Sequence, residues 1–284
     1  MISVLALLSA LGAAGSSFAQ ELKIPAEHHP WGRFPVGSWK LVRVTSESLD
    51  EQGKIVSTTI TETKTTLIQA TAEIYTLRSD VTVTVDGKAF VRPPQTKKLG
   101  FSGEVVGQTL AIKKTGESEV SVNGRKIPCE LRQVEINGDG TKRSHLVYYS
   151  PEIAPHVLRK ESSFAGEAAE TESSAITEAV ALGMPYRVLG ELRPATYQRT
   201  IHTQPQETSV TVEILCDEIP GGVVAHSSRD LSAAGKTVRR STLELVDYAV
   251  ASEKDADTWG GRRRIFHRNR RGRTEELPPK STRR

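Results

Sequence analysis

The stretch VRVTSESLDEQGKIVSTTITE, from Val42 to Glu62, can be laid without a gap over VAHSSRDLSAAGKTVRRSTLE, from Val224 to Glu244. The two stretches share seven of 21 residues, which is more than composition alone would give. Each alternates β-branched or aliphatic residues with polar ones on both sides of a polar turn, which ends in Gly53 or Gly235. Alternation of period two is typical of strands, and glycine supplies the positive φ that a tight turn needs. The sequence therefore predicts two related β-hairpins.

A third, weaker copy runs from Val157 to Val180 and keeps six of 24 residues of the segment that lies 66 residues further on. Its second arm, within Ala169 to Pro185, also fits a helix, because Ile176 and Val180 lie one turn apart before a Gly and a Pro. Copies of one unit should share one conformation. We therefore predict that this arm is a strand.

Further hairpins are predicted between the copies, because Asp86-Gly87, Asn123-Gly124 and residues 137–140 are turn sequences flanked by alternating apolar residues. The predicted fold class is mainly β, with long antiparallel strands in curved sheets or half-barrels, built from repeated hairpins with few helices. We expect a signal peptide at residues 1–19, a partly ordered leading segment at 20–35, β units at 36–118 and 119–250, and a disordered basic tail at 251–284.

Export is predicted from the N-terminus. An apolar run from Ile2 to Gly15 is too short to span a bilayer and is followed by Ser17-Phe18-Ala19, which fits cleavage after Ala19. No Cys stands at the cleavage point, and no second long apolar stretch follows. The mature protein is therefore expected to be soluble, periplasmic or secreted, with no transmembrane segment.

Positive charge is concentrated at the C-terminus. Residues 262–284 carry a net charge of +8, whereas the whole chain carries +4. Such a density of cations would bind polyanions in a salt-dependent way, and an exported protein would meet polyanions of the envelope. Only Phe266 is interleaved as a stacking aromatic, so no specific nucleic-acid binding is expected. The alternative is a solvated tail without a partner. The candidate polyanion-binding residues are Arg262, Arg263, Arg264, Arg268, Arg270, Arg271 and Arg273.

The chain has two cysteines, Cys129 and Cys216. In an oxidising compartment an even number permits one disulfide, whereas free cysteines are usually buried. The sequence leaves both alternatives open.

No familiar catalytic or cofactor motif is present, so no catalytic, cofactor or metal-binding residue is predicted. We expect a non-enzyme, with an enzyme as the less favoured alternative. His28-His29 is expected to be exposed rather than metal-binding. Asn137 to Thr141 resembles a calcium loop but has Lys142 where that loop needs Gly, so a hairpin turn is expected. His226 and Ser227 should point to opposite faces of a strand rather than act together.

The segments VNGRKIPCELRQVE, LVYYSPEIAPHVLRKES, ILCDEIPGGVVAHSSRDL and VRRSTLELVDY resemble uncharacterised exported proteins of planctomycete-type bacteria. The resemblance covers roughly Val36 to Val250. In style the pattern is also similar to the periplasmic lipoprotein-carrier superfamily, whose fold is an open half-barrel with an apolar concave face closed by helices. No lid helix is predicted here, and no functional residue is carried over from either group.

Two hypotheses follow. The first is a non-catalytic exported β-protein that binds an apolar or amphiphilic ligand, or a protein partner, in the concavity of its curved sheet. The second is a secreted hydrolase with a dispersed active site. A pocket with apolar walls favours the first, whereas convergent His, Asp or Glu side chains favour the second.

Overall fold

The structure is a computed structural model that describes residues 22–138, 141–165 and 173–252. Within these residues the chain forms a short 3₁₀ helix, η1 (Ala26–His28), and a series of strands. The strands are β1 (Trp39–Leu49), β2 (Ile55–Ala70), β3 (Ile74–Val85), β4 (Lys88–Val91), β5 (Gln95–Gly100), β6 (Thr109–Val122), β7 (Arg125–Gly138), β8 (Thr141–Tyr149), β9 (Val157–Ala165), β10 (Ser173–Val188), β11 (Glu191–Thr203), β12 (Glu207–Leu215), β13 (Val223–Ser232) and β14 (Thr237–Ala249). The predicted fold class is confirmed.

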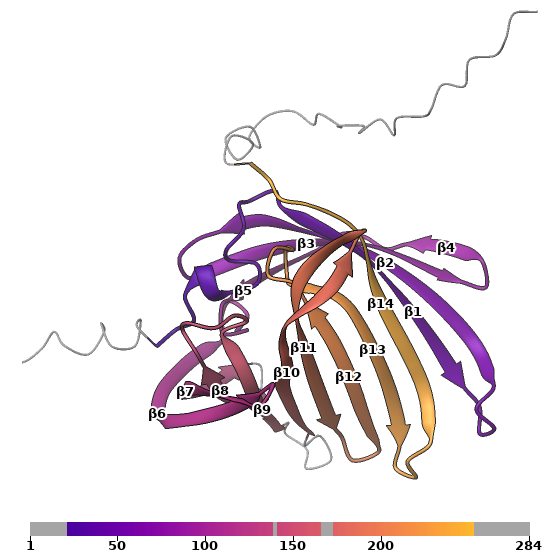
Figure 1. Cartoon of the computed structure of the whole chain (residues 1–284). Coiled ribbons are helices and arrows are strands. Elements are labelled where there is room, and N and C mark those ends of the chain that lie inside the picture. Colours follow the sequence, from indigo (N-terminus) through magenta and orange to yellow (C-terminus); the bar gives the residue numbers. More distant parts are fainter. Residues whose placement is uncertain (1–21, 139–140, 166–172, 253–284) are drawn as a thin grey trace, which may run out of the picture.

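All the strands belong to one antiparallel sheet in the order β4-β3-β2-β1-β14-β13-β12-β11-β10-β9-β8-β7-β6, with β5 also paired to β3. Strands that neighbour each other are consecutive in the chain except at two places, β5 on β3 and β1 on β14. The second of these places the first strand beside the last, in the middle of the sheet (Figure 1). The sheet is curved and its ends at β4 and β6 do not pair with each other. The predicted boundary at residues 118 and 119 falls inside β6, so the two predicted units share one sheet.

The turns explain why the strands form hairpins. Asp86 and Gly87, between β3 and β4, have φ of 49° and 78°, and Asn123 and Gly124, between β6 and β7, have φ of 52° and 72°. Two consecutive residues with positive φ give a tight turn whose twist matches the flanking strands. The Asp-Gly and Asn-Gly pairs therefore form the turns that the sequence predicts.

The three related segments form hairpins with the same register. Gly53 and Gly235 have φ of 78° and 76°, and each donates its N–H to the carbonyl three residues earlier. The first and second hairpins also share a register shift at the same place, before Leu49 and Leu231. Equivalent cross-strand pairs are Arg43 with Glu62, Ala225 with Glu244, and Arg159 with Glu178. The third hairpin has an extended second arm, not a helix. Descent of the three from one unit stays a prediction.

Burial follows the predicted alternation. Val42 and Val224 are 8% and 3% exposed and belong to the same core cluster, whereas Val56 and Val238 are 62% and 37% exposed. Leu158, the equivalent of Val224 in the third hairpin, is fully buried against β6 residues such as Val122. A slip of one residue would turn these side chains to solvent, so burial fixes the register of each hairpin.

The inside of the curve is identified by a cavity. Residues of β6 to β12, including strands that are not neighbours, line one cavity, among them Val134, Val147 and Lys160. Because these side chains converge, their side of the sheet is the concave face. β6 also approaches β10, which strengthens the curl at this end of the sheet. The segment Leu22–Gly37, here called the N-terminal segment, lies against this face and contributes to the cavity lining.

Candidate functional site

The N-terminal segment is held against the sheet by Trp31. The indole is 8% exposed and packs in a cluster with Leu67, Tyr75 and Phe101. The Gly221 N–H, in the loop between β12 and β13, donates to the carbonyl of Pro30 at 2.9 Å. A backbone hydrogen bond therefore joins the N-terminal segment to this loop, in addition to the packing of the Trp31 indole. These contacts attach the described part of the predicted leading segment, residues 22–35, to the sheet.

The close approach at Gly221 predicts a measurable difference between two glycines. A Cβ at Gly221 would lie 2.7 Å from the Trp31 indole, whereas one at Gly235 would have nothing within 4 Å, although both residues have positive φ. Gly221→Ala and Gly235→Ala therefore share a backbone strain of about 1–2 kcal/mol. Gly221→Ala should cost roughly 1–3 kcal/mol more, because a rigid ring must move. Urea unfolding of both variants checks this, and equal losses would contradict the docking of Trp31.

The cavity has a volume of about 290 Å³ and lies between the concave face and the N-terminal segment. Its apolar walls come from the sheet, the N-terminal segment and the loop after β5. Its polar side chains come from β7 to β11, with His28 and His29 added by the N-terminal segment and Ser102 by the loop after β5. The apolar lining includes Ile24, Phe101, Ile112, Val134, Val147 and Leu215, and the polar lining includes Arg132, His145, Lys160, Thr177 and Gln198. One cavity thus combines an apolar wall with cationic and amide groups.

A second depression, of about 400 Å³, lies at the rim of the sheet between the Asn123 turn and β10. Its charged residues, Arg125 and Glu152, are exposed to solvent. Because those charges are already hydrated, this depression offers a ligand fewer strong contacts than the cavity of the concave face.

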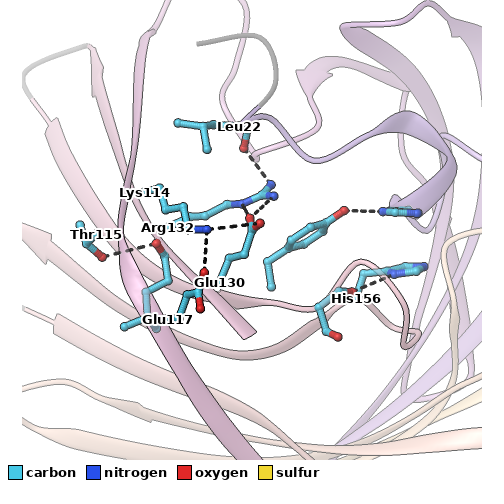
Figure 2. A network of polar contacts seen from close by, with 11 residues as sticks. Leu22, Lys114, Thr115, Glu117, Glu130, Arg132 and His156 are labelled. Atoms are coloured by element: carbon cyan, nitrogen blue, oxygen red, sulfur yellow. Dashed lines mark hydrogen bonds and ion pairs between the residues drawn. The ribbon is translucent and has the colours of Figure 1, made fainter. Parts of the chain in front are cut away.

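Arg132 ties the floor of the cavity to the N-terminal segment (Figure 2). Its guanidinium is 7% exposed, forms an ion pair with Glu130 at 2.6 Å and donates to the carbonyl of Leu22 at 2.9 Å. It also lies 3.8 Å from the centre of the Tyr149 ring. The hydrogen bond from Arg132 lowers the pKa of the Glu130 carboxyl. Since its donors and charge are satisfied, Arg132 is a structural cation of the site.

His28 and His29 are not exposed, which corrects the expectation from the sequence. The His28 ring stacks on His156, with centroids 3.7 Å apart, and its Nδ1 is 2.5 Å from the Tyr149 hydroxyl (Figure 2). The His29 Nδ1 accepts the backbone N–H groups of Trp31 and Gly32 at 3.2 and 3.3 Å. Burial lowers the pKa of His29 to about 4, so its imidazole is neutral. The two histidines anchor the N-terminal segment rather than extend into solvent.

His145 and Lys160 form the polar side of the cavity on neighbouring strands. The His145 Nδ1 is 2.9 Å from the Ser162 hydroxyl, and both residues are buried. Burial, together with the charges of Lys160 and Arg143, lowers the pKa of His145 to about 4. Burial also lowers the pKa of the Lys160 ammonium. Lys160 forms no hydrogen bond or ion pair with any residue in the described ranges, although half-buried charges usually have partners.

A row of hydroxyl groups extends across the concave face beyond the cavity. Directly paired residues lie on the same side of an antiparallel sheet, so the cross-strand register traces a single row from Lys160. The row runs through Thr177, Thr200, Thr211, Ser228, Ser241, Ser46 and Thr59. Thr177 and Thr200 are hydrogen-bonded at 3.0 Å, and Thr211 and Ser228 at 2.7 Å. This row of the concave face is therefore polar beyond the cavity. It also has no α-helix over it in the described part of the chain, which differs from the lipoprotein carriers.

The structure separates the two cysteines. Cys129 and Cys216 are both free and buried, and they belong to different core clusters. Of the two alternatives left open by the sequence, the structure has the pair of single thiols and no disulfide between them. Burial raises the pKa of both thiols, which keeps them protonated.

Other expected features are placed as follows. His226 and Ser227 lie in β13 on opposite faces. Asn137 and Gly138 are the last residues of β7, which pairs with β8, and residues 139–140 of the predicted turn lie outside the described residues. The predicted signal peptide and the candidate polyanion-binding arginines, Arg262 to Arg273, lie outside the described residues. Among residues 22–138, 141–165 and 173–252, no group of three His, Cys, Asp or Glu side chains could hold a metal ion.

Sequence reasoning missed Arg132, His145, Lys160 and Glu213, although a signal for the first two was present. In the sequence, Val134 and Val147 alternate with polar residues on the two sides of the predicted turn at residues 137–140, and Arg132 and His145 each lie two residues before one of them. A charged or imidazole residue at an inward position of an alternating strand is such a signal.

A search for helices that could cross a membrane, restricted to the described residues, finds none.

No protein-family model matches the sequence, and no curated protein matches it. Among solved structures, the chain is similar to a candidate lipoprotein of Parabacteroides distasonis, with 8% identity and a TM-score of 0.32 over 76% of this chain and 96% of that one. It is also similar to a candidate exported protein of Bacteroides fragilis described as having a YmcC-like fold, with 9% identity and a TM-score of 0.31 over 76% and 98% of the two chains. At TM-scores below 0.5, neither likeness carries weight for the fold or the function of this chain.

Proposed function

We propose that this chain is an exported, non-catalytic β-protein that binds a small amphiphilic ligand in the cavity of its concave face. One observation carries the proposal: Lys160 reaches this cavity without a hydrogen bond or ion pair to any described residue, beside apolar side chains such as Val134 and Val147. A ligand with an apolar part and a polar end would satisfy both kinds of surface. A purely apolar ligand would leave the ammonium group desolvated and unpaired.

The size and position of the cavity support a small ligand. Its volume of about 290 Å³ lies near the lower end of the range of roughly 300–1,000 Å³ that is usual for ligand pockets. The N-terminal segment covers it, with His28 and His29 among the lining residues. A ligand there would contact both the sheet and the N-terminal segment.

One contact favours the alternative of a hydrolase, namely the short distance between His145 and Ser162. A serine nucleophile needs a base that is itself oriented by a third group, usually a carboxylate. Here the charges that act on His145 are the cations Lys160 and Arg143, and Ser162 is 6% exposed. The pair therefore fits a buried structural hydrogen bond better than an acyl-transfer site.

Two neighbouring residues of β10 test the proposal. Thr177 lines the cavity, whereas Ile176 points to the opposite face and is 41% exposed. Thr177→Phe should fill the cavity and weaken binding of dodecanoate at least about tenfold, because the ligand's volume is taken. Ile176→Phe adds a similar ring outside and should leave binding unchanged. Isothermal titration of the full chain, below the critical micelle concentration, measures both. Absence of binding by the unmodified protein, or equal effects of the two variants, would contradict the proposal.

A further inference from the structure

Near the cavity, the cationic side chains of the concave face outnumber the carboxylates that act on them. Arg132 is matched by Glu130, as described above. Three other cations, Lys40, Arg143 and Lys160, act on this region, and Glu213 on β12 is the carboxylate that acts on both lysines. The region therefore has an excess of positive charge in a half-buried setting.

Lys40 and Arg143 already donate hydrogen bonds to other described residues, whereas Lys160 does not. The Lys160 ammonium is therefore the cation available to bind a ligand. Lys40 Nζ donates to the carbonyls of Gly221 and Val223 at 3.3 and 3.1 Å. Arg143 donates to the side-chain oxygen of Gln108 at 2.7 Å. Lys160 and Glu213 have no hydrogen bond or ion pair with each other or with any other described residue. Water in the cavity can hydrate the Lys160 ammonium, but the burial of this side chain, which lowers its pKa, limits that hydration.

We propose that the polar end of the cavity binds the anionic head group of the amphiphile, a carboxylate or a phosphate, through an ion pair with Lys160. This inference rests on the function proposed above and specifies the ligand class of the same site. The charge of Arg143 lies close enough to act on both Lys160 and His145, so it would add to the attraction. The neutral His145 would present a polar ring beside the head group.

A cationic or neutral head group fits this site less well. A cation would have to approach Lys160 and Arg143, with Glu213 as the remaining counter-charge, and Glu213 already interacts electrostatically with two lysines. A neutral head group would leave Glu213, with which Lys160 forms no ion pair, as the opposite charge that acts on this ammonium. The half-buried ammonium would then still lack a direct ion pair. An anion removes that cost, and hydrogen bonds to charged groups contribute about 1.5–3 kcal/mol.

Four ligands with the same twelve-carbon chain and different head groups test the inference on the full chain. These are dodecanoate, dodecyl phosphate, dodecyl maltoside and dodecyltrimethylammonium, each used below its critical micelle concentration in isothermal titration. We expect both anions to bind at least about tenfold more tightly than the maltoside, and the cation to bind most weakly. The ratio of the two anions distinguishes a fatty-acid carboxylate from a lipid phosphate.

Three variants test which charged side chain is responsible for the preference for an anionic head group. Lys160→Gln should weaken dodecanoate at least about tenfold and change dodecyl maltoside less than about twofold. Arg159→Gln removes an equal charge from the other face of the same strand and should change neither. Glu213→Gln removes the opposing carboxylate and should tighten dodecanoate about threefold.

The outcomes separate this inference from the function on which it rests. If all four ligands bind equally and Thr177→Phe blocks them all, amphiphile binding stands and the anionic preference is overturned. Equal losses of dodecanoate binding in Lys160→Gln and Arg159→Gln would also overturn it, because the charge would then act at long range. If none of the four ligands binds, both proposals fail.

Discussion

Trp31→Ala is expected to lower the free energy of unfolding by about 3–5 kcal/mol, which is the usual cost of truncating a buried aromatic side chain. The indole is 8% exposed and is packed among Leu67, Tyr75 and Phe101, which belong to the sheet and to the loop after β5. Its removal should leave a void that this rigid surface cannot fill. Urea unfolding of the full chain measures the loss.

The same substitution should release the N-terminal segment before the sheet unfolds. Limited proteolysis under native conditions should then cut the variant between residues 22 and 37, where the unmodified protein is protected. Trp39→Ala is the matched control, since Trp39 is half-buried and Lys64 lies over its ring at 4.1 Å. A loss no larger for Trp31→Ala than for Trp39→Ala, without new cleavage, would show that the segment is not held by Trp31.

Acid should destabilise the protein through two imidazoles. Burial lowers the pKa of His29 and of His145 from 6.5 to about 4. Because the folded pKa lies below the unfolded one, each neutral imidazole contributes stability above about pH 6.5 that is lost as the pH falls to 4. Such a difference corresponds to about 3 kcal/mol for each group.

His145→Asn tests the contribution of one of these two imidazoles. Asparagine has no titration in this range and can still place a polar atom near the Ser162 hydroxyl, as His145 does at 2.9 Å. The variant should lose about 3 kcal/mol less than the unmodified protein between pH 7 and pH 4, measured by urea unfolding at each pH. Parallel pH profiles for the two proteins would contradict a buried neutral His145.

The hairpins could be predicted from the sequence because their determinants are local. Gly53 and Gly235 supply the positive φ of the turns, and the alternation around Val42 and Val224 fixes the buried face. The strand of the third copy, within Ala169 to Pro185, could be recognised through its likeness to the second. These signals are contained within about twenty residues each, so no knowledge of the rest of the fold is needed.

The arrangement of the hairpins could not be predicted in the same way. The pairing of β1 with β14 joins residues about 200 positions apart, such as Arg43 and Glu244. No turn sequence specifies that contact, because it depends on how strands that are distant in the sequence are arranged in the sheet. The docking of Trp31 against Gly221 is equally distant in sequence, which is why the N-terminal segment was expected to be only partly ordered and its histidines exposed.

The candidate site was partly visible in the sequence. His145 and Arg132 each lie two residues before an apolar residue of an alternating strand, Val147 and Val134, so their inward direction could have been inferred. Lys160 and Glu213 come from different hairpins, and only the curvature of the sheet brings their charges to one region. The absence of a short catalytic motif gave no information about such a site, because it is assembled from single residues of separate strands.

Native mass spectrometry of the full chain, purified gently from its own host, tests whether the concave cavity holds an amphiphile. We expect the unmodified protein to carry a non-covalent adduct that is released as an anion with an alkyl chain, and Thr177→Phe from the same host to lack it. Ile176→Phe should retain the adduct. A bare protein mass in every sample, or the same adduct in Thr177→Phe as in the unmodified protein, would contradict ligand binding in this cavity.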